Sequence, residues 1–464
     1  MEIRVDKLRK NLALLQPVVP RNPSLKVLTN VLFRDGAIRA TDLEVEVSIA
    51  MPEITGAAFL LPYRQAMEVL KFVPGDLVLS ITPQDKSVKL SWTGGSAAYP
   101  VPLYNDFPDS ALHAPESEAI VNGDVLTGAM MDALHYVKTG TETNTVPGKK
   151  RGSRTVKSKD AGVSVLSGVG VMLDEHVQIC GADGYRASYE STRLSWPVKQ
   201  TIIVRPDTVG ILDLLWHKEP GKPALSNDFI AQITAARPLK LGIWEGRMSA
   251  QFADITLVST LITGTYPDVL ALLNGFKEPI KVKFFGPDLE TAARRLAAVA
   301  KESTEITYLV WNEAAMTVSA QSAEVGEVSA EITVLEGSQP GRIALKCSYL
   351  LDYLAGKTGL ITMGNAGQDS PALFHYGSRP IVAIMPMKAI WGDEPVEEAK
   401  AQEAPAAAAE EAPVSAEPTD PEAVNEEETG EPGEPGDEPE EVEETDAETV
   451  NNPEPAAVGP ESEE

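Results

Sequence analysis

The sequence has little of what would mark a secreted or membrane protein. Only two cysteines, Cys180 and Cys347, occur among 464 residues, so they are expected to be small core residues of a reduced protein rather than a disulfide framework. No run of about 18 apolar residues is present, so no helix is predicted to span a membrane. Residues 1–16 are charged throughout and lack the apolar centre of a signal peptide. These features predict a cytoplasmic location.

Motifs for catalysis and for metal or cofactor binding are absent. The five histidines are scattered, without an HxH or HExxH pair for a metal. Neither GxGxxG nor GxSxG occurs. Gly356-Lys357-Thr358 resembles the end of a phosphate-binding loop, but Leu351 stands where that loop needs its first glycine. The sequence therefore predicts no catalytic residue, no metal site and no cofactor.

The acidic charge is confined to one end of the chain. The formal net charge is −28, yet residues 393–464 alone hold 27 acidic residues and one basic residue. Residues 1–392 are left with 41 acidic and 39 basic residues, so the body of the chain is nearly neutral. Residues 392–464 are rich in Glu, Pro and Ala and are expected to be a disordered tail. Two roles remain open for it: a solubilising extension, or a regulatory segment that imitates DNA or binds a basic partner.

A pattern of about 140 residues occurs three times. Residues 27–51, 166–194 and 306–334 each read as a strand, a short turn, a strand and a corner. The corners begin at Ala40, Gly181 and Ala320, which are 141 and 139 residues apart. A second marker, a strand end that leads into a short amphipathic helix, begins at residues 61, 204 and 345 with spacings of 143 and 141. Two markers with one period predict three tandem copies of one domain.

The copies are predicted to be α+β domains, each with two helices on antiparallel sheets. The expected boundaries are 1–116, 117–276 and 277–391, with the tail at 392–464. Apolar spacing predicts first helices at 5–16, about 123–137 and 288–301, with Leu8, Leu12 and Leu15 on the buried face of the first.

Basic residues lie on the polar faces of the predicted helices and in one insertion. The insertion, at about 139–160, is rich in Gly, Ser and Thr and is expected to be a mobile loop. A basic run of this kind is either simply solvated or contacts nucleic acid. The candidate DNA-contacting residues are Lys7, Arg9, Lys10, Arg21, Arg64, Lys71, Lys149, Lys150, Arg151, Arg154, Lys157, Lys159, Arg294 and Arg295.

The segment Asp183-Gly184-Tyr185-Arg186 is the most reactive-looking cluster. Its counterpart in the first copy is Thr41-Asp42-Leu43-Glu44, which keeps only the aspartate. An aspartate that recurs without its neighbours is expected to cap backbone N–H groups at a corner. The competing hypothesis is an enzyme that uses Asp183 and Arg186.

Several segments together resemble the bacterial DNA polymerase III beta subunit, the sliding clamp. They are LTNVLF with ATDLEVEV, YPVPLYNDFP, ADGYRAS, ADITLVSTLITGTYPD, SAEVGE and IMPMK, in this order between Met1 and about Trp391. The resemblance implies a clamp-type domain in three copies and a homodimeric head-to-tail ring around double-stranded DNA, held without sequence specificity. It implies a non-catalytic processivity factor whose partners, the DNA polymerase, the clamp loader and repair polymerases or ligase, dock through short peptides. The alternative is a repeat scaffold or virion protein that does not encircle DNA.

The resemblance also assigns two further sites. A partner-peptide pocket is carried over onto Leu166, Ala182, Gly184, Tyr185, Ala187, Pro267, Leu272, Pro371, Ile384, Met385, Pro386 and Met387. The ring joint is carried over onto Tyr99, Val299 and Ala300.

The sequence departs from the family at several of these positions. Tyr185 stands where the family often has His, and Ala271 where many members have Arg. Asn22 replaces a DNA-facing Arg, and Ser164-Val165 replaces an aromatic pair. Because the basic insertion lies just upstream of Ser164, we expect it to supply the missing DNA contacts. The small side chains at positions 299 and 300 predict a weaker ring joint.

Overall fold

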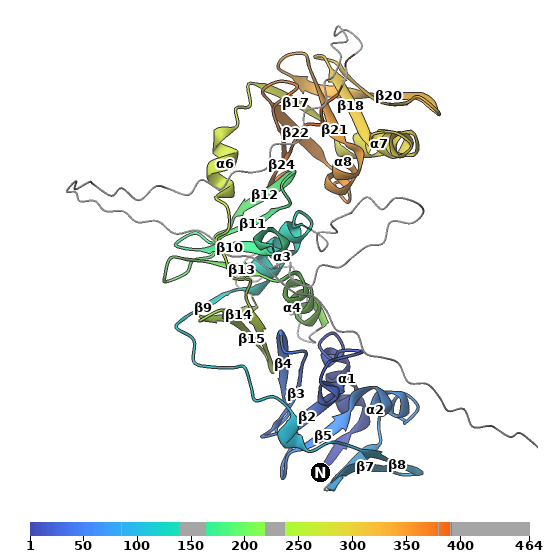
Figure 1. Cartoon of the computed structure of the whole chain (residues 1–464), viewed down its shortest axis with the longest axis vertical. Helices are drawn as coiled ribbons and strands as arrows, with labels where there is room; N and C mark the ends of the chain where they lie inside the picture. Colours follow the sequence, from blue (N-terminus) through green and yellow to red (C-terminus); the bar gives the residue numbers. More distant parts are fainter. Residues whose placement is uncertain (85, 139–163, 219–236, 379, 390, 392–464) are drawn as a thin grey trace, which may run out of the picture. The chain divides into compact units, whose positions relative to one another are not determined.

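One order of elements occurs three times in the chain. The computed structural model describes residues 1–84, 86–138, 164–218, 237–378, 380–389 and 391, and Figure 1 labels many of its helices and strands. Within these residues the order is a strand, a helix, four strands, a second helix and three strands, and it recurs from β1, from β9 and from β17. We call these runs the first, second and third sets.

The first set contains β1 (Glu2–Arg4), α1 (Val5–Leu15), β2 (Asn30–Arg34), β3 (Ala37–Thr41), β4 (Val45–Ala50), β5 (Phe59–Pro62), α2 (Tyr63–Leu70), β6 (Val78–Gln84), β7 (Ser87–Trp92) and β8 (Gly95–Pro100). The second contains β9 (Ser117–Asn122), α3 (Gly123–Leu134), β10 (Val169–Leu173), β11 (Gln178–Ala182), β12 (Arg186–Ser191), β13 (Gln200–Val204), α4 (Pro206–Lys218), β14 (Pro238–Trp244), β15 (Arg247–Phe252) and β16 (Ile255–Thr260).

The third set follows the short helix α6 (Val269–Gly275). It contains β17 (Ile280–Phe285), α7 (Gly286–Lys301), β18 (Ile306–Trp311), β19 (Ala315–Ser322), β20 (Gly326–Gly337), β21 (Gly341–Lys346), α8 (Cys347–Leu354), β22 (Leu360–Asn365), β23 (Ala372–His375) and β24 (Ile381–Ile384). Short 3₁₀ turns lie at η1 (Lys26–Thr29), η2 (Tyr104–Asp106) and η3 (Val165–Ser167).

The first helix of each set buries the apolar stripe that its sequence predicts. In α1, Leu8, Leu12 and Leu15 are fully buried, as a 3.6-residue period requires. The helix α3 ends at Leu134, three residues before its predicted end at 137. There the Tyr136 N–H donates to the Ala133 carbonyl, which tightens the last turn.

The predicted corner aspartates cap backbone groups. Asp183 Oδ1 accepts hydrogen bonds from the N–H groups of Tyr185 and Arg186, at 2.9 and 2.7 Å. Asp42 Oδ1 does the same for Glu44 and Val45 in the first set. A side chain that satisfies two N–H groups fixes a tight corner between strands, so the structural interpretation of this aspartate is confirmed.

Strands from neighbouring sets pair with each other, so the sheets continue across the joints between sets. Between the first and second sets, β4 pairs antiparallel with β16, from Val45 opposite Ser259 to Ile49 opposite Ile255. Between the second and third sets, β12 pairs antiparallel with β24, with Ala187 opposite Ala383. The resulting sheets have the orders β5-β2-β3-β4-β16-β15-β14-β9 and β13-β10-β11-β12-β24-β23-β22-β17-β20-β19-β18-β21, beside a four-stranded sheet β1-β6-β7-β8.

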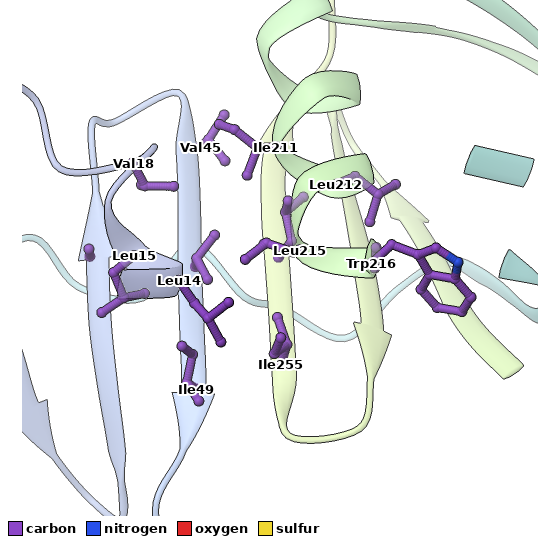
Figure 2. Close-up of a cluster of buried hydrophobic side chains, with 14 of the residues drawn as sticks. Leu14, Leu15, Val18, Val45, Ile49, Ile211, Leu212, Leu215, Trp216 and Ile255 are labelled. Carbon is purple, nitrogen blue, oxygen red and sulfur yellow. The ribbon is translucent and has the colours of Figure 1, made fainter. Parts of the chain in front are cut away.

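A hydrophobic cluster closes the joint between the first and second sets (Figure 2). Leu14 at the end of α1 and Val18 just after that helix belong to one cluster with Ile211 and Leu215 of α4. Leu215 is fully buried. Because this contact adds to the β4–β16 ladder, the joint has both a backbone and a side-chain component.

The structure also bears on the expectations for the cysteines, for membrane-spanning helices, and for the insertion and the tail. Cys180 and Cys347 are both free and buried, which confirms their placement in the core. Among the described residues, no helix is long and apolar enough to cross a membrane. The insertion at 139–160 and the tail at 392–464 lie outside the described residues.

The joint cluster makes a prediction about stability. Leu215→Ala should lower the free energy of unfolding by about 2–5 kcal/mol, because it removes buried methyl groups and leaves a cavity. Leu103→Ala is the matched control, since Leu103 is 54% exposed. Chemical denaturation of the full chain measures both variants, and equal effects would contradict a packed joint.

Candidate functional site

A cavity of about 170 Å³ lies where the second set meets the third. Its lining residues come from η3, the end of β11, the corner before β12, the start of β12, the segment around α6, and the end of β24 with the residue after it. They are Leu166, Ala182, Gly184, Tyr185, Arg186, Ala187, Pro267, Asp268, Val269, Leu272, Phe276, Ala383 and Met385. We call this cavity the apolar pocket.

Small residues create the apolar pocket. Ala187 and Ala383 face each other across the β12–β24 ladder, and two methyl groups leave space where larger side chains would close it. Gly184 has a φ of +94°, and the space that a Cβ would enter there is open. That backbone conformation favours glycine, and it lets the chain turn sharply beside the opening.

Flexible and apolar side chains form the rim. Tyr185, Leu272 and Met385 are 62%, 50% and 40% exposed. The Met385 N–H donates to the Tyr185 carbonyl at 2.9 Å, which joins the two sides of the rim. An apolar depression with exposed aromatic and methionine side chains suits the apolar anchors of a short peptide.

Below the rim, α6 and a buried thiol support the wall. Asp268 caps α6 by accepting a hydrogen bond from the Ala271 N–H at 2.8 Å. Burial raises the pKa of the Cys180 thiol to about 12, so this thiol stays protonated and behaves as a small apolar side chain. Tyr266 packs against Gly170, where any Cβ would lie 2.5 Å from the ring. These contacts hold the wall in place, and their role is structural.

The structure brings eight of the sequence-predicted pocket residues together and places four elsewhere. Leu166, Ala182, Gly184, Tyr185, Ala187, Pro267, Leu272 and Met385 line the apolar pocket. Ile384 does not, since it is fully buried in the core of the third set. Pro371 is buried and Pro386 half-buried, and neither lines the pocket. Met387 packs with Ile306, Ala344 and Trp391, because its N–H donates to the Ala344 carbonyl.

Sequence reasoning missed five lining residues, Arg186, Asp268, Val269, Phe276 and Ala383. For one of them, Ala383, the sequence contained a signal that could have been used. Successive residues of a strand point to opposite faces, so Ala383, rather than Ile384, shares a face with Met385. The helix around Val269 is too short for a periodic signal in the sequence.

An arginine beneath the corner ties the second set to the third. Arg186 is 9% exposed. Its Nε lies 3.0 Å from Asp183 Oδ2, and its Nη1 lies 3.1 Å from Asp352 Oδ2 at the end of α8. Its guanidinium carbon lies 4.2 Å from the centre of the Tyr349 ring. Since Asp183 uses one oxygen for the corner and the other for Arg186, both groups are engaged in structural contacts, which disfavours the enzyme hypothesis.

A second, wider cavity of about 680 Å³ lies at the same joint between α3 and the end of α8. Its lining includes Asp132, Tyr136, Asp352, Tyr353 and Gly356. The Tyr353 hydroxyl is buried and has no hydrogen-bond partner among the described residues. The helix contact at this joint is therefore looser than the hydrophobic cluster of the preceding joint.

The candidate DNA-contacting residues divide into paired and unpaired groups. Lys7 pairs with Glu53, Lys71 with Glu68 at 3.8 Å, and Arg294 with Glu290 at 2.6 Å, while Arg9 donates to the Leu70 carbonyl at 3.3 Å. Among these candidates, the exposed bases without an ion pair or hydrogen bond in the described part of the chain are Lys10, Arg21, Arg64 and Arg295. The six bases Lys149, Lys150, Arg151, Arg154, Lys157 and Lys159 lie outside the described residues.

The three residues assigned to the ring joint lie in two different environments: one is on strand β8, and two are in the core of the third set. Tyr99 lies on β8, and its hydroxyl donates to the Gln65 carbonyl of α2 at 3.3 Å. Val299 and Ala300 are only 6% and 1% exposed, because they pack into the core of their own set. They leave little side-chain surface for a partner.

Comparison with solved structures identifies the fold. The DNA polymerase III subunit beta of Pseudomonas aeruginosa superposes with a TM-score of 0.70 at 20% identity, covering 84% of this chain and 100% of that one. The beta subunit of Thermotoga maritima gives 0.68 at 17% identity, covering 84% and 99%, and the sliding clamp of Bacillus subtilis gives 0.68 at 16%, also covering 84% and 99%. No family model and no curated protein matches the chain. The chain thus has the sliding-clamp fold.

The Arg186 contacts generate a prediction for the site. Arg186→Ala should lower the free energy of unfolding by about 3 kcal/mol or more, since it leaves the carboxylate of Asp183, whose side chain is only 10% exposed, without its ion-pair partner. Arg294→Ala should change it by less than about 1 kcal/mol, because the Arg294–Glu290 pair is exposed. Urea titration of both variants measures the difference, and equal effects would show that the network does not hold the corner.

Proposed function

We propose that this protein is a sliding clamp: a non-catalytic, homodimeric ring that encircles double-stranded DNA in the cytoplasm and tethers a DNA polymerase. The observation that carries the proposal is the fold, which it shares with solved sliding clamps over 84% of its length and nearly all of theirs. In this proposal the three sets are three domains, at 1–116, 117–276 and 277–391, followed by an acidic tail.

Open strand edges support closure into a ring. Each joint within the chain pairs the fourth strand of one set with the last strand of the next, as β4–β16 and β12–β24. Two strands have no such partner within the chain: β20, the fourth strand of the third set, and β8, the last strand of the first set. Among the described residues, β8 pairs only with β7, and residues 326–333 of β20 pair only with β19.

Unpaired edges attract further strands. A second copy placed head to tail would supply β8 to β20 and β20 to β8, which closes both edges with one repeated contact. The ring therefore extends, between chains, the pairing that the chain already uses within itself.

DNA binding in this proposal is electrostatic and independent of sequence. Lys10, Arg21 and Arg64 are exposed and unpaired within the described residues, so they are available to phosphates. A ring needs no base contacts, because encirclement retains the DNA while diffuse charge keeps the sliding barrier low. The basic insertion would add to this charge, and Lys7, Arg9, Lys71 and Arg294 would contribute at longer range.

The apolar pocket is the proposed docking site for short peptides of the polymerase, the clamp loader and repair polymerases or ligase. Its size suits one or two apolar side chains, and the methionine at its rim can adapt to different ones. A Pseudomonas aeruginosa sliding clamp with this fold has been solved bound to griselimycin. Tyr185 at the rim would give this pocket its own peptide preference.

The docking role of the apolar pocket can be tested without disturbing the ring. Leu272→Glu places a charge on the pocket rim and should shorten the products of a clamp-dependent polymerase on primed circular DNA by about tenfold or more, without changing the dimer. Leu43→Glu is the control, since Leu43 is 49% exposed and lies outside the pocket. Product lengths unchanged by Leu272→Glu would refute the docking assignment.

A further inference from the structure

One aromatic side chain is exposed at the end of the second helix of the first set. In the second and third sets, the second helix lies at a joint. Phe72, just after α2, is 80% exposed, and the ammonium nitrogen of Lys71 lies 5.4 Å from its ring centre. Within α2, the Gln65 carbonyl accepts a hydrogen bond from the Tyr99 hydroxyl of β8 at 3.3 Å. The first set thus carries an exposed aromatic ring just after the helix that contacts the open strand β8.

The two joints within the chain show what this region of a set contacts. At each joint, the end of a first helix lies near the second helix of the next set. Leu14 and Val18 of the α1 end lie with Ile211 and Leu215 of α4 (Figure 2). At the following joint, the end of α3 and the end of α8 line the 680 Å³ cavity together.

Buried residues align the second helices of the first and third sets. Cys347, Leu350 and Leu354 are core positions of α8, and Tyr63, Ala66 and Leu70 are those of α2. Each pair is separated by the same 284 residues. The same step matches Gly356 with Phe72. Gly356 lines the cavity at its joint, so its sequence counterpart Phe72 marks the end of α2 that would face the joint between two copies.

The first helices align in the same way. Leu126, Met130 and Ala133 are core positions of α3, and Leu289, Ala293 and Leu296 are core positions of α7. The constant step of 163 residues matches Asp132 and His135, which line the same cavity, with Arg295 and Ala298. Arg295 and Ala298 are both exposed, and Arg295 has no ion pair among the described residues.

We propose that Phe72 of one copy packs against Arg295 and Ala298 on α7 of a second copy and is the main anchor of the joint between them. The proposal rests on the dimeric ring of the proposed function. Ala298 is small enough to admit the ring, and a guanidinium over an aromatic face is a favourable pairing. At the joint between the second and third sets, Gly356 has no side chain and a cavity remains. At the joint between copies, Phe72 has a large side chain, which fills the corresponding space. Arg295 is thereby assigned to the joint instead of to DNA.

Sedimentation velocity of the full chain over a dilution series tests the anchor. Phe72→Ala should raise the dimer Kd by about 30-fold or more, since truncation of a central aromatic anchor removes most of its buried area. Ile120→Ala should leave the Kd unchanged, although Ile120 is 73% exposed. Thermal unfolding of the purified variant confirms that Phe72→Ala is folded.

A double-mutant cycle tests the contact itself. Arg295→Ala and Phe72→Ala together should weaken the dimer by less than the product of their separate effects, because the two residues share one interaction. Arg294→Ala should leave the Kd unchanged. Independent effects of Phe72 and Arg295 would overturn the pairing.

The readouts separate this inference from the proposed function. A wild-type dimer that Phe72→Ala leaves intact would overturn the anchor and preserve the ring. A wild-type chain that stays monomeric at micromolar concentration would overturn both. Arg295→Ala should also leave the salt dependence of DNA binding unchanged, whereas loss of a phosphate contact would reduce its slope by about 0.9.

Discussion

Backbone hydrogen bonding at strand edges is the constraint on which this structure depends. A strand at the edge of a sheet carries N–H and C=O groups that require partners. The chain satisfies them between sets by the same antiparallel contact twice, β4 with β16 and β12 with β24. Among the described residues this scheme leaves β8 and residues 326–333 of β20 with one partner strand each, which supports the proposed second copy.

The joints share a geometry but differ in side-chain chemistry. The first is closed by aliphatic residues such as Leu14 and Leu215, whereas the second uses Arg186 and Asp352 beside a cavity. This difference bears on function. The apolar pocket takes Ala187 from one set and Ala383 from the next, so the second joint must keep its register for the pocket to exist. An arginine held by two carboxylates and an aromatic ring fixes that register with directional contacts.

Much of the fold could be predicted from the sequence, because periodic patterns report burial within one element. The stripe of α1 and the caps of Asp42 and Asp183 are local features. The pocket needed the resemblance, since Leu166, Pro267 and Met385 are distant in sequence and no local pattern joins them. Ile384 and Met387 lie outside the apolar pocket, because Ile384 faces the core and Met387 lies beyond the end of β24, and the resemblance specifies neither feature. The burial of Val299 and Ala300 depends on tertiary packing, which sequence spacing alone does not show.

Encirclement is the central claim, and retention on DNA of defined topology tests it most directly. The protein is loaded by a clamp loader onto nicked circular DNA, separated from free protein, and the circle is then cut once to give free ends. A ring that holds on by encirclement leaves the linear DNA within minutes, while an uncut circle retains it. Equal retention on cut and uncut DNA would show that the protein grips the duplex, and would contradict the account.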